Sequence, residues 1–356
     1  MKFEEGYYIT PSNLPNKGIL FVDHAANNRS GHLGHALVQC ENGDILAFYP
    51  NCSDDGGGHS AVGWMEYKRS RDFGKTWEPP MIYTYSKQYF QLDINTSVMA
   101  EKAVVTNDGT IVIFHLLCDI SENPLWEPYR VPTYSRSFDQ GLTWTKAEEI
   151  DKDCGRIYDA VYYEKEIFVL KFCNDARINW TGCLPEHQYK IYVSNDSGAS
   201  FHKRSVIPFS TYGRGYGTLC FLKNGDLIAY CYNSADEYHA DYVISHDSGR
   251  TWEKPEKAYF AKKLRNPQMI AFGDGYLMHG RSGNTEPDAG NFVLYYSENG
   301  IEWDDGRILA KCEAGYGAYS NSIIVDEPNR ERVYIHSSHA YADNKTNILA
   351  WWVDKI

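Results

Sequence analysis

Arginine, histidine and tyrosine side chains recur where predicted strands of this chain begin, and in the loops beside those strands. Guanidinium groups bind carboxylates, bidentately where the geometry allows, whereas imidazole and phenol groups transfer protons or act as nucleophiles. Such a set could bind an anionic substrate and cleave a bond next to its charge. Its members are His24, His32, His35, His59, Tyr158, Asp159, Arg177, Tyr212, Arg214, Tyr216, Arg265, Arg281, Tyr316, Tyr319 and His339.

A turn motif that recurs along the chain predicts the elements that position these side chains. It reads Ser-x-Asp-x-Gly-x-Thr-Trp at 70–77, 137–144 and 245–252, with a weaker copy at 194–201 and a shorter one at 297–303. In such a turn the Asp bonds backbone N–H groups, the Gly adopts a positive φ, and the aromatic residue packs back under the sheet. A carboxylate that recurs in every repeat indicates a fold device and not a catalytic group.

A second turn signal precedes most copies, at 41–44, 107–110, 223–226 and 273–276, so each repeat contains two hairpins. Four antiparallel strands per repeat are the blade of a β-propeller. The blades begin near Leu37, Ala103, Ala160, Leu219, Met269 and Ile323, which predicts six.

The sixth blade lacks an outer strand within its own repeat. Its strands are predicted at 321–325, 332–337 and 347–353, where the sequence nearly ends. We therefore expect a strand at about 18–23 to complete this blade and close the ring, which removes the exposed sheet edges. Residues 1–356 are predicted to form one all-β, six-bladed propeller domain.

Composition excludes several classes of partner. The formal net charge is −12, and no basic stripe is visible, so we expect neither a nucleic-acid partner nor a membrane surface. The aromatic share of 15% with 28 Tyr fits strands or a sugar-binding surface. Nine Cys without a CxxC pair indicate free thiols, and the absence of an apolar leader favours a cytoplasmic location. Without a metal-binding motif, neither a metal nor another cofactor is expected.

The Ser-Asp-Gly-Trp repeats resemble the Asp boxes of the sialidase (neuraminidase) superfamily and cover nearly the whole chain. The resemblance implies a glycosidase in which three Arg bind the substrate carboxylate, an Asp is the acid/base, and a Tyr with a Glu beside it is the nucleophile. Segment 317–321 is similar to the family's Tyr-Ser segment, which implies Tyr319 as the nucleophile. Arg281 matches the third Arg.

Other positions depart from the family pattern. Segment 30–37, where the family has Arg-Ile-Pro, contains His32 and His35 but no Arg. Blade four carries Tyr216 and Tyr232 where the family has its Glu and second Arg. The loop expected to hold the acid/base offers Asp54, Asp55 or His59.

The repeat turns join the third and fourth strands, so the opposite face of the ring is predicted to carry the site. The expected catalytic residues are His35, His59, Tyr158 and Tyr319, and the expected substrate-binding residues are His24, Arg177, Arg214, Tyr216, Arg265 and Arg281. We expect a hydrolase acting on an acidic oligosaccharide. One alternative is a lyase on uronate or rhamnose-glucuronate glycans that uses His35, His59, Tyr158 and Arg177, and another is a glycan-binding propeller without catalysis.

Overall fold

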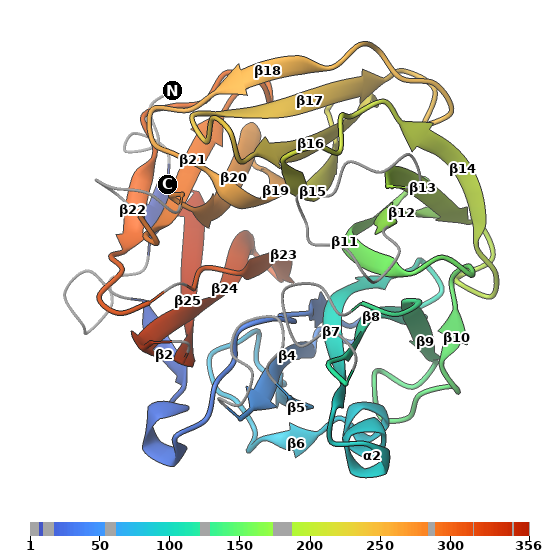
Figure 1. The fold of residues 1–356 in the computed structure, drawn as a ribbon, viewed down its shortest axis with the longest axis vertical. Coiled ribbons are helices and arrows are strands. Elements are labelled where there is room, and N and C mark those ends of the chain that lie inside the picture. Colours follow the sequence, from blue (N-terminus) through green and yellow to red (C-terminus); the bar gives the residue numbers. More distant parts are fainter. Residues whose placement is uncertain are drawn as a thin grey trace.

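The computed structural model describes residues 7–9, 18–53, 62–121, 129–173, 187–283, 289–315, 317–343 and 345–355. Its strands form six antiparallel sheets arranged around a central axis, a six-bladed β-propeller as the sequence predicts (Figure 1). In each of the first five blades the strands pair in chain order from the axis outward.

The bounds of the elements in these five blades are as follows. Blade one comprises β3 (Leu37–Gln39), β4 (Ile45–Cys52), β5 (Gly63–Ser70) and β6 (Met81–Ile82), and is followed by the helix α2 (Thr84–Leu92). Blade two comprises β7 (Thr96–Val105), β8 (Ile111–Asp119), β9 (Thr133–Ser137) and β10 (Glu148–Glu149). Blade three comprises β11 (Gly155–Tyr163), β12 (Glu166–Cys173), β13 (Gln188–Ser194) and β14 (His202–Ile207). Blade four comprises β15 (Arg214–Phe221), β16 (Leu227–Asn233), β17 (His239–Ser245) and β18 (Glu256–Tyr259). Blade five comprises β19 (Arg265–Phe272), β20 (Gly275–Arg281), β21 (Phe292–Ser297) and β22 (Arg307–Ala310).

Blade six joins the two ends of the chain. Its inner strands are β23 (Ser320–Glu327), β24 (Arg330–Ala342) and β25 (Lys345–Lys355). The strand β2 (Ile19–Val22) pairs antiparallel with β25, and β1 (Tyr7–Ile9) pairs with the same strand nearer its C-terminal end. Figure 1 shows the blue β2 beside the red β25. The N-terminal strand therefore closes the ring as predicted, and the short 3-10 helix η1 (Ala25–Asn27) follows it.

The repeat turns are held by their own side chains. In the first copy Ser70 Oγ accepts a hydrogen bond from Gly74 N at 2.7 Å, and Asp72 Oδ1 accepts one from Thr76 N at 2.8 Å. The same two bonds recur in the copies at 137–144, 194–201 and 245–252. Hydrogen bonds from Thr76 lower the pKa of Asp72 to about 2. These carboxylates are therefore used in building the turns.

Neighbouring blades pack through apolar clusters and through bonds to these turns. Arg69 of blade one donates to the carbonyl of Gln140 in the blade-two turn at 2.7 Å, and Arg204 of blade three donates to the carbonyl of Ser248 in the blade-four turn at 3.0 Å. One apolar cluster joins blades five and six and includes Phe292, Leu294, Val333, Ile335 and Trp351. Apolar side chains therefore hold blades five and six together.

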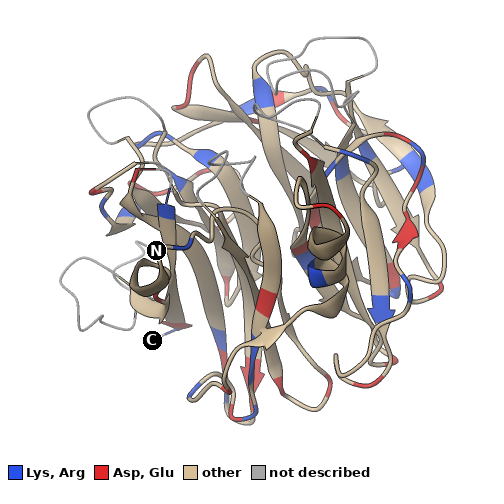
Figure 2. Ribbon diagram, turned by 60° about the horizontal axis from the view of Figure 1, so that its bottom comes forward, with Lys and Arg blue, Asp and Glu red and all other residues tan. Residues whose placement is uncertain are grey.

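The remaining surface features give the setting of the site. Figure 2 shows Lys and Arg interspersed with Asp and Glu along the described blades. The described cysteines are free thiols. Within the described ranges no helix has the length and apolar character needed to span a bilayer.

Candidate active site

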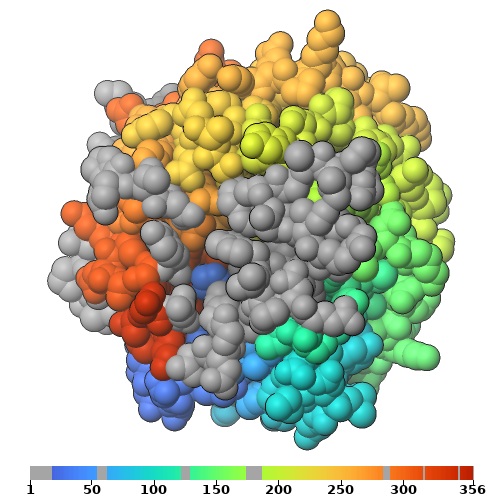
Figure 3. All heavy atoms as spheres, in the orientation of Figure 1, coloured from blue at the N-terminus to red at the C-terminus, as the bar shows by residue number. Residues whose placement is uncertain are grey.

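The six blades converge at the ring axis on a small cavity. Its volume is about 30 Å³, room for about one water molecule. Figure 3 shows one face of the ring, with part of the N-terminal segment (blue) visible in a hollow near the axis. Every blade contributes to the lining, which consists of Gly34 and His35 before β3, Glu101 and Lys102 in β7, Arg156 and Tyr158 in β11, Tyr216 in β15, Asn266 and Gln268 in β19, and Tyr319 and Ser320 of blade six.

Irregularities in the first strands coincide with this lining. The register of β7 against β8 shifts between Ala100 and Lys102, and that of β11 against β12 shifts between Ile157 and Asp159. Similar shifts lie at 214–217 in β15 and at 265–268 in β19. A β-bulge re-aims the side chain of the extra residue. Bulges thus occur where Glu101, Tyr158 and Tyr216 line the cavity.

Tyr319 lines the cavity and is buried among polar and cationic groups. Tyr216 donates a hydrogen bond to the Tyr319 hydroxyl oxygen at 3.3 Å. The His32 ring packs against the Tyr319 ring with centroids 4.6 Å apart. The guanidinium carbons of Arg281 and Arg156 lie 5.7 and 5.9 Å from the centroid of the same ring. The Tyr319 phenol therefore lies close to one tyrosine, one histidine and two arginines.

The backbone just before Tyr319 is held in an uncommon conformation. Ala318 has φ of 61°, in the left-handed region that residues with a Cβ rarely occupy. Ala318 N donates to the Ser338 carbonyl at 2.7 Å, and Tyr319 N donates to Ser338 Oγ at 3.1 Å. Strand β24 therefore imposes the strain that aims this tyrosine, as is common at functional sites.

Arg156 is fixed by an ion pair with Glu101 across blades two and three. Its Nε and Nη2 donate to Glu101 Oε2 at 2.9 and 2.6 Å, and its Nη1 donates to the hydroxyls of Tyr216 at 2.8 Å and Tyr129 at 3.3 Å. Both charged side chains are buried. Burial raises the pKa of Glu101, and the Arg156 guanidinium opposes that shift. The two bonds to Glu101 and the short bond to Tyr216 thus set the orientation of this guanidinium.

Arg265 and Arg281 face each other as cross-strand partners in blade five. Arg265 donates to the Tyr232 hydroxyl at 2.8 Å and forms an ion pair with Glu237 at 3.2 Å, while Arg281 donates to the Gly317 carbonyl at 3.5 Å. Burial lowers the pKa of Arg281, and the nearby Arg265 guanidinium adds to that shift. A nearby anion would offset the repulsion between these two guanidinium groups.

The histidines before β3 are buried and neutral at pH 7. Burial lowers the pKa of His32 to about 3 and that of His35 to about 4. His35 Nε2 donates to the His32 carbonyl at 3.2 Å, which leaves Nδ1 as the basic nitrogen of His35. The structure places His24 apart from them, in a separate groove of about 530 Å³ beside η1 and β5.

Other residues of the predicted set either do not line the axial cavity or lie outside the described part of the chain. Arg214 forms an ion pair with Asp241 at 2.5 Å, and Tyr212 is largely exposed. Asp159 is buried in an ion pair with Lys102 at 2.9 Å. His339 lies in β24, half-buried. The predicted residues outside the described ranges are Asp54, Asp55, His59, Arg177 and Tyr316.

Sequence reasoning missed five charged or amide side chains that line the cavity. They are Glu101, Lys102, Arg156, Asn266 and Gln268. A signal was present for some of them, because a charged pair precedes the predicted strand start at Ala103, and Arg156 stands two residues before Tyr158. These five side chains come together in the cavity only when the blades pack around the axis, and this packing is not visible in a short motif.

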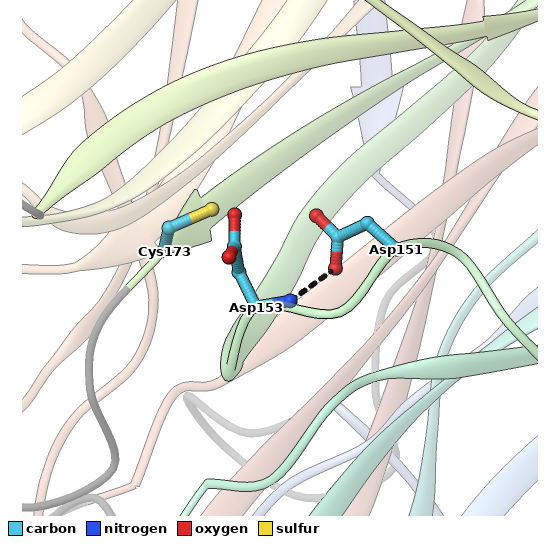
Figure 4. Close-up of side chains that lie close together, drawn as sticks. All are labelled: Asp151, Asp153 and Cys173. Atoms are coloured by element: carbon cyan, nitrogen blue, oxygen red, sulfur yellow. Dashed lines mark hydrogen bonds between the residues drawn. The ribbon is translucent and has the colours of Figure 1, made fainter.

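A cluster of possible metal ligands lies in blade three, outside the axial cavity. Asp151, Asp153 and Cys173 have ligand atoms within 4.8 Å of one another, and Figure 4 shows the side chains together. Lys171 forms an ion pair with Asp151, and Lys190 forms one with Asp153 at 2.6 Å. The lysines therefore supply the positive charge that a metal ion would bring.

Comparison with solved structures identifies proteins of the same fold. A protein of unknown function from Dyadobacter fermentans matches with a TM-score of 0.76 and 14% identity, over 99% of this chain and 100% of its own. The Hadza microbial sialidase Hz136 matches with a TM-score of 0.70 and 17% identity, over 94% of this chain and 68% of its own. A Trypanosoma rangeli sialidase mutant displaying trans-sialidase activity matches with a TM-score of 0.64 and 13% identity, over 95% of this chain and 58% of its own.

At these identities the likeness concerns the fold, so the chain has the propeller fold of sialidases. No family model matches the sequence, and no curated protein sequence matches it significantly.

Proposed function

We propose that this protein is a glycosidase that cleaves the bond at or next to an acidic sugar, with Tyr319 as the nucleophile. The observation that carries the proposal is that Tyr319 and Arg156 line the axial cavity, while Arg281 and Arg265, which are not part of the lining, pack on neighbouring tyrosine rings. Arg281 and Arg156 flank the Tyr319 ring, and Arg265 lies 4.7 Å from the ring of Tyr232. The chain as a whole has a formal charge of −12, and two of these arginines, Arg156 and Arg265, are paired with Glu101 and Glu237.

The structural neighbours support the same chemistry. Several are sialidases, and one is a Trypanosoma rangeli sialidase in complex with 2,3-difluorosialic acid, described as a covalent intermediate. A covalent glycosyl intermediate requires a protein nucleophile close to the anomeric carbon. We propose Tyr319 for this role, because it is a buried phenol that lines the axial cavity.

The arginines are proposed to bind the sugar carboxylate. Hydrogen bonds between guanidinium and carboxylate groups are charge-assisted and about twice as strong as neutral ones. Arg281 and Arg265 would hold the carboxylate between β19 and β20, and Arg156 would add a third cation from β11. The carboxylate would thereby fix the anomeric carbon beside Tyr319.

Hydrolysis of a panel of fluorogenic glycosides tests this proposal. The panel includes glycosides of N-acetylneuraminic acid and glucuronic acid and, as neutral counterparts, glycosides of glucose and galactose. We expect turnover of at least one acidic glycoside and none of its neutral counterpart. Tyr319→Phe should lower kcat/KM by about 100-fold or more. Equal turnover of acidic and neutral glycosides, or full activity in Tyr319→Phe, would contradict the proposal.

A lyase is the second candidate, because His35 and Tyr158 line the same cavity as Arg156. In β-elimination an Arg neutralises the uronate carboxylate while a His or Tyr removes the α-proton. A pKa near 4 makes His35 a weak base, which favours hydrolysis. An ultraviolet trace separates the two reactions, because only elimination gives a conjugated double bond. Glycan binding without turnover would instead indicate a non-catalytic propeller.

A further inference from the structure

The hydroxyl group of Tyr216 connects Tyr319 to the Arg156–Glu101 ion pair. Tyr216 lies in β15 of blade four, at a position where the sialidase resemblance leads one to expect a Glu. Its ring packs near that of Tyr319, with centroids 5.3 Å apart. Its hydroxyl is 2.8 Å from Arg156 Nη1 and 3.3 Å from the Tyr319 hydroxyl. A phenol therefore meets Tyr319 where a carboxylate would be expected.

The direction of these hydrogen bonds follows from their chemistry. A guanidinium group can only donate, so the Tyr216 oxygen accepts from Arg156. A phenol has one proton, and that proton is then directed to the Tyr319 oxygen. Arg156 also donates two bonds to Glu101, at 2.6 and 2.9 Å, so the ion pair holds the guanidinium that donates to Tyr216, and Tyr216 in turn donates to Tyr319.

We infer that Tyr216 is a catalytic residue that donates a hydrogen bond to the Tyr319 oxygen and stabilises the negative charge that this oxygen carries during the reaction. The inference rests on the proposed function, since it assigns a partner to the proposed nucleophile. In this site the proposed nucleophile would have a neutral hydrogen-bond donor beside it, where the sialidase pattern has a carboxylate acceptor.

The reaction written with this role balances in two steps. In the first, Tyr319 Oη bonds to the anomeric carbon, the bond to the aglycone oxygen breaks, and the Tyr319 proton ends on the aglycone. In the second, a water oxygen bonds to the anomeric carbon and the bond to Oη breaks. The electron pair of that bond goes to Oη, which then takes a proton from the attacking water. Negative charge appears on Oη in both steps, and the Tyr216 proton faces it.

The protonation state of Tyr216 agrees with a donor role. Burial raises the pKa of Tyr216 well above its ordinary value, although the Arg156 guanidinium opposes the shift. The hydroxyl proton is therefore present throughout the neutral pH range. Pre-organised donors aimed at developing charge are among the largest contributions to catalysis.

Tyr216→Phe tests the inference, with Tyr129→Phe as the matched control. The Tyr129 hydroxyl accepts from the same Arg156 Nη1 at 3.3 Å, and Tyr129 is also buried, so its removal takes one phenolic acceptor from Arg156 and leaves the Tyr216–Tyr319 bond in place. Loss of one donor to developing charge costs about 100- to 1,000-fold in kcat. Because the bond is long, we expect a loss of about 10- to 100-fold in Tyr216→Phe with KM changed by less than about threefold. Tyr129→Phe should stay within about threefold of the wild type in kcat.

A second readout separates catalysis from a structural role. Since Tyr216 would stabilise Tyr319 as the leaving group of the second step, Tyr216→Phe should accumulate the glycosyl–enzyme adduct during turnover, visible by intact-protein mass spectrometry. Melting temperatures of both variants check that the fold is retained. An active wild type with unchanged kcat in Tyr216→Phe, or equal losses in both variants without an adduct, would overturn this inference alone. A wild type inactive on every acidic glycoside would overturn the proposed function and this inference with it.

Discussion

Replacing Glu101 by Gln should destabilise the protein strongly, because it leaves the Arg156 guanidinium buried without its counter-charge. Arg156 is 4% and Glu101 8% exposed in their side chains, and two hydrogen bonds join them. Removing one partner of a buried ion pair costs about 3 to 5 kcal/mol in the free energy of unfolding. Because the Gln amide retains one oxygen acceptor, we expect about 3 kcal/mol.

Urea unfolding of the two proteins measures this loss, with Glu149→Gln as the control. Glu149 pairs with Lys152 at 2.5 Å, but their side chains are 45% and 88% exposed, so the control should change stability by less than about 1 kcal/mol. A loss below about 1 kcal/mol in Glu101→Gln, equal to that of the control, would refute the reasoning.

Two further predictions concern pH and ring closure. The free energy of unfolding should fall as the pH drops from about 6.5 towards 4, because the unfolded chain protonates its histidines there while His32 and His35 stay neutral until pH values near their folded pKa values of about 3 and about 4. Each such histidine contributes about 1.4 kcal/mol per pH unit to the slope of the unfolding free energy against pH. His32→Gln should therefore reduce this slope, which urea titrations at several pH values measure. An unchanged slope in His32→Gln would contradict the prediction. Deleting residues 1–23 should expose the edge of β25, lower the melting temperature and produce oligomers that light scattering detects. Deleting residues 1–6 is the control and should have neither effect. If the longer deletion gives a monomer of unchanged stability, β2 is dispensable.

The fold was predictable because its signal is local and repeated. Each Ser-Asp-Gly-Trp turn carries its own hydrogen bonds, as at Ser70 and Asp72, so the motif marks a hairpin independently of the rest of the chain. Five blades of four strands and a sixth of three leave one strand position empty, and the segment containing β2 was the remaining candidate to fill it. Counting repeats was sufficient for the architecture.

The site was predictable only in part, because its pairings cross between blades. Tyr319 and Arg281 could be singled out from short motifs that resemble a family pattern. Glu101 and Arg156 are 55 residues apart and meet only when blades two and three pack together. Bulges in β7, β11, β15 and β19 add to the difficulty, because they change which side chain faces the axis without a clear signal in the sequence.

The central claim is that Tyr319 attacks the anomeric carbon of an acidic sugar. The most direct test is to incubate the protein with a fluorinated analogue of whichever acidic glycoside it hydrolyses and to map the labelled peptide by mass spectrometry. Our account predicts one glycosyl unit on the peptide that contains Tyr319 and no label in Tyr319→Phe. A label on another residue, or hydrolysis that persists in Tyr319→Phe, would contradict it.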